Sequence, residues 1–506
     1  MKKSITNYLD EVGKIYKNKN VFIENKDKKI SYSKFINESK IIATNILKNK
    51  SIYNKPIAIF IDKSIETLTS MFGIMYSGNF YTVLDTTSPE TRINTIINTL
   101  NPEYIITNNK NIEKLRKYNI NIPILNIDEF DNILDKKVLK KVDDIRIDTD
   151  PAYVLFTSGS TGVPKGSVIT HKSLITYTTW FKETFDINDT TIFGNQTPFY
   201  FSMSVSDVFS TVMSGATLNI IPKINFSFPV NLMKYLNEYK INTIYWVPSA
   251  LSIVANLNTF DYILPKYLKK VLFAGEVMTM PQLNIWRKHL PSIMYANLYG
   301  PTETTDICTY YIVNRKFKDN ETLPIGKHCN NTEILLVNSE GKEAAPGEIG
   351  ELYVRGSFVG NGYYNNQEKT NSAFVQNPLN PHFIETVYKT GDLGKYNKYG
   401  EIEYFGRIDF QIKHMGYRIE LGEIETNINS LKGLTICACI YDNKNKQIVL
   451  FYESLNLNDE DVVNYTNKKL LKYMQPNKII KLKKMPYNAN GKIDRVKLKE
   501  IYESEY

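Results

Sequence analysis

The chain has 506 residues, of which 42% are hydrophobic and 12% aromatic, enough for a large core and about three domain-sized units. Its formal net charge is +9, but lysine is spread along the whole chain, so we do not read the charge as a nucleic-acid-binding surface. The sequence lacks both a signal-peptide pattern and an apolar run long enough to span a bilayer, so we expect neither secretion nor membrane insertion.

The four cysteines, Cys308, Cys329, Cys437 and Cys439, do not have the spacing of a structural zinc site. Cys437 and Cys439 are two residues apart in a strand-like run, so we expect both to pack on one face of a core. Free cysteines fit a reducing compartment, and we expect a cytoplasmic protein.

Strand and helix patterns alternate in the first part of the chain. Residues 56–61 are typical of a buried strand, and residues 65–76 have apolar side chains at helical spacing before Gly78. Short strands are expected at 105–107 and 124–125, and a polar connector at 144–150. The alternation predicts parallel sheets covered by helices.

Residues 152–156 form a β-favouring run that leads into the loop TSGSTGVPKG at 157–166. Glycines allow backbone N–H groups to approach an anion, hydroxyls add donors and Lys165 adds a positive charge, so the loop suits a polyphosphate. It lacks the Gly-Lys-Ser/Thr ending of a Walker loop. The alternative is an ordinary Ser/Gly turn.

Two later runs, at 243–247 and 270–274, are expected to be buried strands, each followed by small or polar residues. In parallel α/β sheets, ligands bind beyond the carboxyl ends of the strands. These strand ends are therefore candidate pocket walls.

Five motifs along the chain carry a family resemblance. The phosphate loop is followed by YANLYGPTETTD at 295–306, YKTGD at 388–392, GRIDFQIKHMGYRIE at 406–420 and PYNANGKID at 486–494. Together they closely resemble the adenylate-forming superfamily, which includes acyl-CoA synthetases, luciferases and the adenylation domains of nonribosomal peptide synthetases. The resemblance extends from about residue 30 to the end of the sequence.

The resemblance implies an α/β fold with two domains. Residues 1–408 would form a large N-terminal adenylation core of helix-flanked β-sheets plus a small β-barrel-like part. Residues 409–506 would form a small, mobile α+β C-terminal domain that carries the catalytic lysine, with Asp409 as its hinge.

The resemblance also assigns an ATP site with a magnesium ion. The loop from Thr157 to Lys165 would hold the β and γ phosphates, Glu303 would bind Mg²⁺, and Asp392 would accept both ribose hydroxyls. Tyr299 would stack on the adenine, and Arg407 would lie near the ribose and phosphate. The expected ATP-binding residues are Thr157, Ser158, Gly159, Ser160, Thr161, Gly162, Lys165, Gly275, Glu276, Asn297, Tyr299, Gly300, Thr302, Asp392, Arg407 and Lys492.

Lys492 follows the Asn490-Gly491 turn, where a surface lysine would be the default interpretation. The resemblance instead implies that Lys492 bridges the substrate carboxylate and the α-phosphate, acting with Glu303 and Thr157 as the catalytic residues. Rotation about Asp409 would then remove Lys492 and present the loop 413–416 for thioester formation. His414 and Met415 depart from the residues common at these positions.

The acid pocket is where the sequence departs from its relatives. Domains that activate α-amino acids have Asp where this chain has Ser202, and a buried ammonium without that partner would cost about 3 to 5 kcal/mol. We therefore expect an acid without an α-amine, such as a hydroxybenzoate whose hydroxyl donates to Asp306. Alternatively, Asp306 caps a helix or takes over the ammonium. The expected pocket residues are Phe201, Ser202, Met203, Ser206, Ala250, Leu272, Ala274, Leu298, Asp306 and Ile307.

The predicted function is ATP-dependent activation of a carboxylic acid to an acyl-AMP. Because little sequence follows Lys492, we expect transfer to the phosphopantetheine thiol of a separate carrier protein. Alternatives are amino-acid adenylation for a carrier protein, a coenzyme A ligase, and an inactive binding protein. The lysines between 468 and 484 form either a solvated face or a docking surface for an acidic partner.

Overall fold

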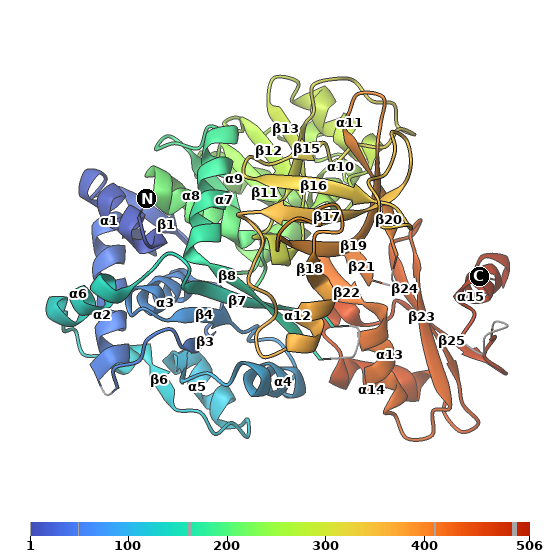
Figure 1. Ribbon diagram of the computed structural model, residues 1–506, viewed down its shortest axis with the longest axis horizontal. Coiled ribbons are helices and arrows are strands. Elements are labelled where there is room, and N and C mark those ends of the chain that lie inside the picture. Colours follow the sequence, from blue (N-terminus) through green and yellow to red (C-terminus); the bar gives the residue numbers. More distant parts are fainter. Residues whose placement is uncertain (1, 49, 160–162, 409–410, 488–492, 506) are drawn as a thin grey trace. The chain divides into compact units, whose positions relative to one another are not determined.

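The computed structural model describes residues 2–48, 50–159, 163–408, 411–487 and 493–505 (Figure 1). The chain divides into two compact units. Unit 1 comprises Met1–Thr86, Ile97–Phe156 and Gly166–Ile408, and unit 2 comprises Thr87–Ile96, Thr157–Lys165 and Asp409–Tyr506. Unit 2 thus gathers two short earlier segments with the residues after 408, and the single boundary expected from the sequence stays a prediction.

The first sheet of unit 1 has the strand order β6-β5-β3-β4-β7-β8. β3 pairs in parallel with β4 and β5, and all five of its residues are buried, as expected of a central strand covered on both faces. The strands expected at 56–61, 105–107 and 124–125 are confirmed. The bounds are β3 (Pro56–Phe60), β4 (Phe80–Val83), β5 (Tyr104–Thr107), β6 (Ile124–Asn126), β7 (Pro151–Thr157) and β8 (Lys165–Thr170).

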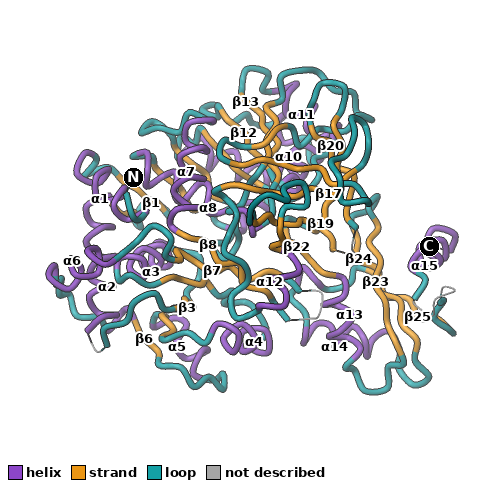
Figure 2. The backbone as a smooth tube through the Cα atoms, viewed as in Figure 1, coloured by secondary structure: helices purple, strands orange, loops and turns teal. Residues whose placement is uncertain are grey.

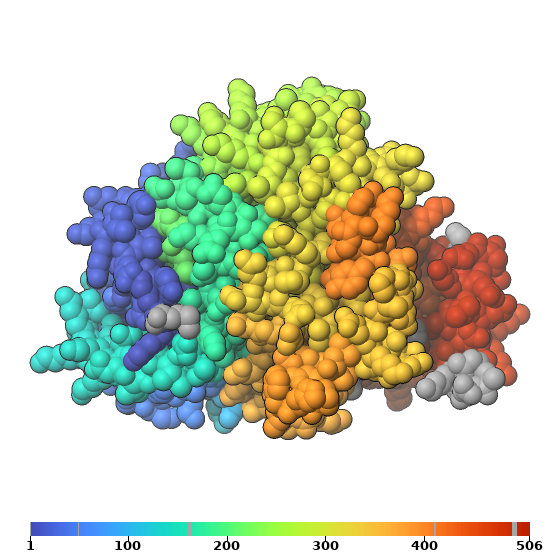
Figure 3. Space-filling view, turned by 45° about the horizontal axis from the view of Figure 1, so that its top comes forward, coloured from blue at the N-terminus to red at the C-terminus, as the bar shows by residue number. Residues whose placement is uncertain are grey.

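Helices in this part of the chain begin at side-chain caps. Ser4 caps α1, and Ser64 caps α3, which spans the predicted residues 65–76. The sequence did not predict α6, because its lysine-rich run buries only Val142. The bounds are α1 (Ile5–Ile15), α2 (Tyr32–Lys48), α3 (Ile65–Tyr76), α4 (Glu90–Leu100), α5 (Asn109–Arg116) and α6 (Lys136–Ile145). The blue residues of the first helices adjoin the cyan residues before and within α6 in Figure 3.

The second sheet of unit 1 has the order β15-β14-β13-β12-β11-β9-β10-β1-β2. β10, β9, β11, β12 and β13 run in parallel, so their carboxyl ends share one edge. The bounds are β1 (Asn20–Ile23), β2 (Lys29–Ser31), β9 (Ile192–Asn195), β10 (Thr217–Ile220), β11 (Thr243–Trp246), β12 (Lys270–Phe273), β13 (Met294–Tyr299), β14 (Thr309–Ile312) and β15 (Lys327–His328).

Helices flank the strands of unit 1 (Figure 2). One hydrophobic core runs through these layers and includes the fully buried Trp246 and Trp286. In the described residues, no helix is long and apolar enough to cross a membrane. The helices that accompany the second sheet are α7 (His171–Thr184), α8 (Ser204–Ser214), α9 (Pro229–Glu238), α10 (Pro248–Asn256) and α11 (Met280–His289).

A third sheet of unit 1 is antiparallel and corresponds to the small part expected to be β-barrel-like. Its order is β16-β17-β19-β18, and β20 pairs with β19. This pairing sets Asp392 opposite Arg407. The bounds are β16 (Thr332–Val337), β17 (Gly350–Gly356), α12 (Gln367–Ala373), β18 (Phe374–Gln376), β19 (Thr386–Tyr396) and β20 (Ile402–Arg407).

Unit 2 contains a two-stranded and a three-stranded sheet. Cys437 and Cys439 lie in one buried cluster, whereas Ala438 and Ile440 lie in another, which confirms the alternation expected in this strand. Of the predicted loop 413–416, Lys413 and His414 instead belong to strand β21 and pair with Arg418 and Tyr417, and Met415 and Gly416 form the turn of the β21–β22 hairpin. The bounds are β21 (Gln411–His414), β22 (Tyr417–Glu420), α13 (Leu421–Asn429), β23 (Ile436–Asp442), β24 (Gln447–Glu453), α14 (Asp459–Lys469), β25 (Lys478–Leu482) and α15 (Arg495–Glu505).

Candidate active site

The candidate site of unit 1 lies where the parallel strands of the second sheet end. β11 and β12 are paired up to Trp246 and Phe273, and β12 pairs with β13 up to Asn297. The segments that follow contain Ala250, the Gly275-Glu276 pair and Gly300. The segments predicted to form pocket walls thus follow the carboxyl ends of the parallel strands, and their role in a pocket stays a prediction.

A tight turn between β13 and β14 carries several predicted site residues. The backbone N–H of Cys308 donates to the carbonyl of Tyr299 at 2.8 Å, which closes the turn. A Cβ atom on Gly300 would lie 2.4 Å from the carbonyl oxygen of Asp306, so only glycine fits there. Asp306 has a φ of 86°, a conformation that L side chains rarely adopt and that often marks functional sites.

Glu303 is completely buried within this turn. Its Oε1 accepts a hydrogen bond of 2.6 Å from the hydroxyl of Tyr363, and its carbonyl accepts one of 2.8 Å from the N–H of Gly360. The carboxylate is therefore held in one orientation.

A divalent metal at Glu303 would find few protein ligands. Within the described residues, no three His, Cys, Asp or Glu side chains are grouped to hold a metal ion. Mg²⁺ at nucleotide sites commonly takes one or two carboxylates and completes its shell with phosphate and water. The single buried carboxylate of Glu303 fits that kind of metal.

Asp392 is the centre of a second buried cluster in unit 1. Its Oδ1 accepts from Arg407 at 2.8 Å and from Tyr404 at 3.4 Å, and its Oδ2 accepts from the Tyr299 hydroxyl at 2.5 Å. Burial raises the pKa of Tyr299 well above its usual range, and the neighbouring carboxylate raises it further. The Tyr299 hydroxyl is thus a stable donor that fixes Asp392.

The carboxylate of Asp392 has some hydrogen-bonding capacity left for the ribose hydroxyls that it is predicted to bind. Each carboxylate oxygen has two lone pairs, so Oδ2 can accept one more donor beside Tyr299, whereas two protein donors already approach Oδ1. A diol could bind if the long contact from Tyr404 gives way. Ribose recognition by Asp392 stays a prediction.

The predicted adenine-framing residues have structural partners of their own. Glu276 accepts a hydrogen bond of 2.8 Å from the N–H of Ser249 in the first turn of α10, and Asn297 donates to the carbonyl of Pro324 at 2.9 Å. Gly275 has a φ of 90°, which explains glycine at this position. These contacts hold the segment in place.

Asp306 is 2% exposed and is surrounded by hydroxyl groups. Its Oδ2 accepts from Ser206 at 2.6 Å, from Tyr245 at 3.1 Å and from Tyr177 at 3.2 Å. Burial raises the pKa of Asp306 to about 6, although hydrogen bonds from these side chains and from Ser202 oppose the shift.

The helix-cap interpretation of Asp306 is wrong. Asp306 follows the short 3₁₀ turn Thr302–Thr304, and in the described part of the chain its carboxylate accepts from side-chain hydroxyls instead of a helix N-terminus. The backbone at this position has a positive φ, which a helix cap does not require. The carboxylate therefore lies in a buried cluster of hydroxyl groups, and its role in the acid pocket stays a prediction.

The other predicted pocket residues lie around Asp306 on neighbouring elements. The hydroxyl of Thr302 donates to Ser202 at 3.2 Å, which links the β13–β14 turn to the segment before α8. Phe201 is half-buried. The buried members of the set are Met203, Ser206, Ala250, Leu272, Ala274, Leu298 and Ile307.

Sequence reasoning missed two tyrosines of this pocket. Tyr177 lies on α7 and Tyr245 on β11, and both are fully buried. A tyrosine inside a strand predicted to be buried needs a partner for its hydroxyl, and this was a signal for Tyr245. Helical spacing alone gave no signal for Tyr177.

Sequence reasoning also missed Lys63, a half-buried lysine that bonds two backbone carbonyls. Lys63 donates to the carbonyl of Gln196 at 3.0 Å and to that of Asn195 at 3.4 Å, and the Asn195 amide donates to Asp207 at 2.7 Å. Burial lowers the pKa of Lys63 and raises that of Asp207, while their mutual attraction opposes both shifts. This network supports the ends of β9 and α8.

The phosphate-loop residues belong to unit 2, where they contact the α13 region. Ser158 donates to the carbonyl of Arg418 at 2.6 Å, and the N–H of Gly159 donates to Glu423 at 3.3 Å. Glu423 also forms a buried ion pair with Arg92. The Gly159 N–H thus binds an anionic oxygen, which is the chemistry expected of this loop.

Not all loop and catalytic residues can be placed. Thr157 donates to the carbonyl of Lys165 at 3.5 Å. The predicted residues Ser160, Thr161, Gly162, Asp409 and Lys492 lie outside the described residues. Their phosphate-binding, hinge and catalytic roles remain predictions.

Comparison with known families decides the identity. The AMP-binding enzyme family matches residues 9–364, which include the phosphate loop, Glu303 and Asp306. The chain belongs to the AMP-binding enzyme family.

Two relatives of this AMP-binding enzyme come from bacilli. Zwittermicin A synthase ZmaJ from Bacillus cereus is 32% identical over 462 residues, covering 89% of this chain and 86% of the relative. Bacitracin synthase 1 from Bacillus licheniformis is 32% identical over 471 residues, covering 92% of this chain. The chain spans only 9% of the length of bacitracin synthase 1.

Two solved structures have the same fold. Holo-PA1221, an NRPS protein containing adenylation and PCP domains bound to a vinylsulfonamide inhibitor, has a TM-score of 0.82 at 19% identity, covering 98% of this chain and 84% of that one. The o-succinylbenzoate CoA synthetase MenE from Bacillus subtilis, a double mutant bound with a product analogue, has a TM-score of 0.83 at 20% identity, covering 98% of each chain. The α/β fold expected from the sequence is confirmed.

Proposed function

We propose that this enzyme adenylates a hydroxyaryl acid, such as a hydroxybenzoate, and transfers it to the phosphopantetheine thiol of a carrier protein. The observation that carries the proposal is the hydroxyl-lined carboxylate of Asp306 beside Ser202. Four protein hydroxyls stabilise this carboxylate, so a neutral substrate hydroxyl is a sufficient further donor. The apolar side chains of Met203 and Leu298 suit a flat ring.

The second candidate is an acid that carries an amine. The described partners of Asp306 are all hydroxyl groups, so its charge has no cationic side chain bonded to it. A substrate ammonium would supply that charge. Ser202 replaces the usual aspartate, and this substitution favours an amine that is not on the α-carbon.

The reaction needs charge neutralisation because both the acid and the α-phosphate are anions. Mg²⁺ bound through Glu303 would offset charge on the pyrophosphate. Within the proposal, Asp392 positions the ribose and Lys492 contacts the carboxylate and the α-phosphate, so that the attack is held in line.

The acceptor is proposed from chemistry that two proteins of the same fold share. Holo-PA1221 contains an adenylation and a PCP domain, and MenE is a CoA synthetase. Both acceptors present a thiol. We favour a carrier protein because holo-PA1221, which has the same fold, combines adenylation and PCP domains. Coenzyme A is the alternative acceptor.

The test is ATP/pyrophosphate exchange with Mg²⁺ against hydroxybenzoates, aminobenzoates, and α- and β-amino acids. Exchange with hydroxybenzoates that falls at least tenfold in Asp306→Asn would support the proposal. Exchange only with aminobenzoates or β-amino acids would establish the second candidate. Exchange with α-amino acids alone would contradict the assignment of Ser202, and no exchange with any acid would contradict the proposed substrate class.

Thiol transfer is measured separately with the acid that gives exchange. Acylation of an added holo carrier protein, with little product on coenzyme A, would support the carrier assignment. The opposite preference would establish a coenzyme A ligase.

A further inference from the structure

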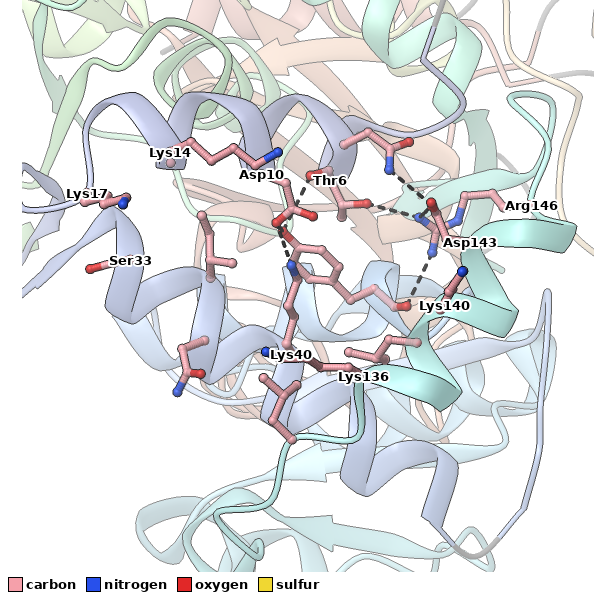
Figure 4. A pocket seen from close by; sticks show the side chains of 17 residues that line it. Thr6, Asp10, Lys14, Lys17, Ser33, Lys40, Lys136, Lys140, Asp143 and Arg146 are labelled. Atoms are coloured by element: carbon pink, nitrogen blue, oxygen red, sulfur yellow. Dashed lines mark hydrogen bonds and ion pairs between the residues drawn. The ribbon is translucent and has the colours of Figure 1, made fainter.

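A cavity of about 580 Å³ lies within unit 1, away from the residues of the candidate active site (Figure 4). Its walls come from α1, α2 and α6, with Tyr76 at the end of α3 and the segment before α6 completing the lining. None of the predicted ATP-binding or acid-binding residues lines it. The cavity therefore needs a separate explanation.

Positive charge dominates the lining. Two carboxylates, Asp10 and Asp143, face the cavity. The cationic side chains are Lys14, Lys17, Lys40, Lys136, Lys140 and Arg146. Arg146 is 2% exposed at the base of the cavity, whereas the lysines of α6 lie at its exposed rim.

Both carboxylates already have partners. Asp10 accepts from Lys40 and from the hydroxyl of Tyr76, each at 2.7 Å. Asp143 accepts from Asn7 at 3.1 Å and lies 3.6 Å from Arg146. Neither is available to balance the remaining lysines.

Four lysines of the lining are thus left without a counter-charge. In the described residues, Lys14, Lys17, Lys136 and Lys140 have no side-chain hydrogen bond or ion pair, whereas nearby Lys48 pairs with Asp131. The charge of Lys14 also contributes, after burial, to lowering the pKa of Lys2. Such uncompensated charge around a concave site attracts anions.

The cavity also has apolar walls, formed by Ile36, Leu134 and Leu139. A Cβ atom on Gly13 would lie 2.2 Å from the Cδ1 atom of Ile36, so α1 and α2 approach closely beside the cavity. Apolar surface with a few charged groups is typical of a site for an organic ligand.

We propose that this basic cavity binds a small organic ligand that carries at least two negative charges. The ammonium groups of Lys14, Lys136 and Lys140 bind the anionic groups, and the apolar walls contact the carbon framework. The volume lies within the range of about 300–1,000 Å³ typical of small-molecule sites.

The first test is a fluorescence titration with the trianion 8-hydroxypyrene-1,3,6-trisulfonate. We expect saturable binding that weakens about tenfold in the double variant Lys136→Gln/Lys140→Gln. The matched control, Lys137→Gln/Lys141→Gln, changes the same charge on another face of α6 and should change affinity less than about twofold.

Competition by citrate or by tripolyphosphate identifies the anionic group that the cavity prefers, carboxylate or phosphate. The proposal is overturned by an absence of saturable binding, by equal losses in both double variants, or by failure of both anions to displace the probe. Thermal unfolding of each variant checks that its fold is intact, and exchange activity should be unchanged in all of them.

Discussion

At the scale of single residues, the hydrogen-bond donors around two buried carboxylates, Asp306 and Asp392, set the properties of each. Asp306 keeps its carboxylate buried because hydroxyls from α7, α8 and β11, and that of Ser202 before α8, approach it. Asp392 is held by Tyr299 and Arg407, one on each oxygen. These two carboxylates support separate predictions, one on stability and one on nucleotide affinity.

Asp306→Asn should change how stability depends on pH. The pKa of Asp306 in the folded protein, about 6, is above the ordinary value of 3.8. Ionisation of Asp306 therefore lowers the free energy of unfolding progressively as pH rises from about 4 to 6, and this loss stays constant at higher pH. Relative to wild type, the variant should gain about 3 kcal/mol in unfolding free energy between pH 4 and pH 8. Urea denaturation at several pH values measures it, and a pH-independent difference would contradict it.

Asp392→Ala should raise the KM for ATP at least about tenfold, because the ribose loses a charged acceptor. Tyr404→Phe is the matched control, since its hydroxyl lies 3.4 Å from the same carboxylate and its loss should change KM by less than about threefold. Exchange kinetics with varied ATP provide the measurement. Equal KM values for wild type and Asp392→Ala would remove Asp392 from the nucleotide site.

At the scale of elements, the site depends on the turn between β13 and β14. This turn presents Thr302, Glu303 and Asp306 from one short segment, and Gly300 allows it to pack against its own returning backbone. The parallel strands beside it end at a shared carboxyl edge, where the proposed acid pocket would lie. A change to the turn should therefore affect chemistry more than the fold of the sheet.

Gly300→Ala should reduce exchange activity by about a hundredfold or more, because the new methyl group would displace the backbone of Asp306 and Ile307. Gly400→Ala is the control, since a Cβ there meets nothing within 4 Å and adds only backbone strain. Activity measured beside circular dichroism distinguishes the two effects. Full activity in Gly300→Ala would mean that the turn tolerates displacement.

At the scale of the whole molecule, the chain consists of two compact units with separate cores. The expected catalytic lysine belongs to unit 2, whereas Glu303, Asp306 and Asp392 belong to unit 1. The proposed adenylation uses Lys492 as well as these carboxylates.

Lys492→Ala should lower exchange at least a hundredfold, because one charged donor to the reacting groups is lost. Thioester transfer from chemically supplied acyl-AMP should change less than about threefold, since that step does not use Lys492 in the proposed mechanism. Lys484→Ala, another lysine of unit 2, serves as the control. Parallel losses in both half-reactions would point to a general defect in unit 2.

The sequence by itself determined the alternation of strands and helices and the small or polar segments that follow the parallel strands. These follow from local patterns, because apolar periodicity and glycine-rich turns are short-range properties. It also identified Asp306 and Ser202 as the distinctive pocket residues.

Only the tertiary structure decided what surrounds Asp306. Tyr177, Ser206 and Tyr245 are far apart in the chain and meet at one carboxylate because α7, α8 and β11 pack together. It likewise revealed the basic cavity that α6 helps to form together with α1 and α2. Burial and long-range packing set these features, and neither is encoded in a local run of residues.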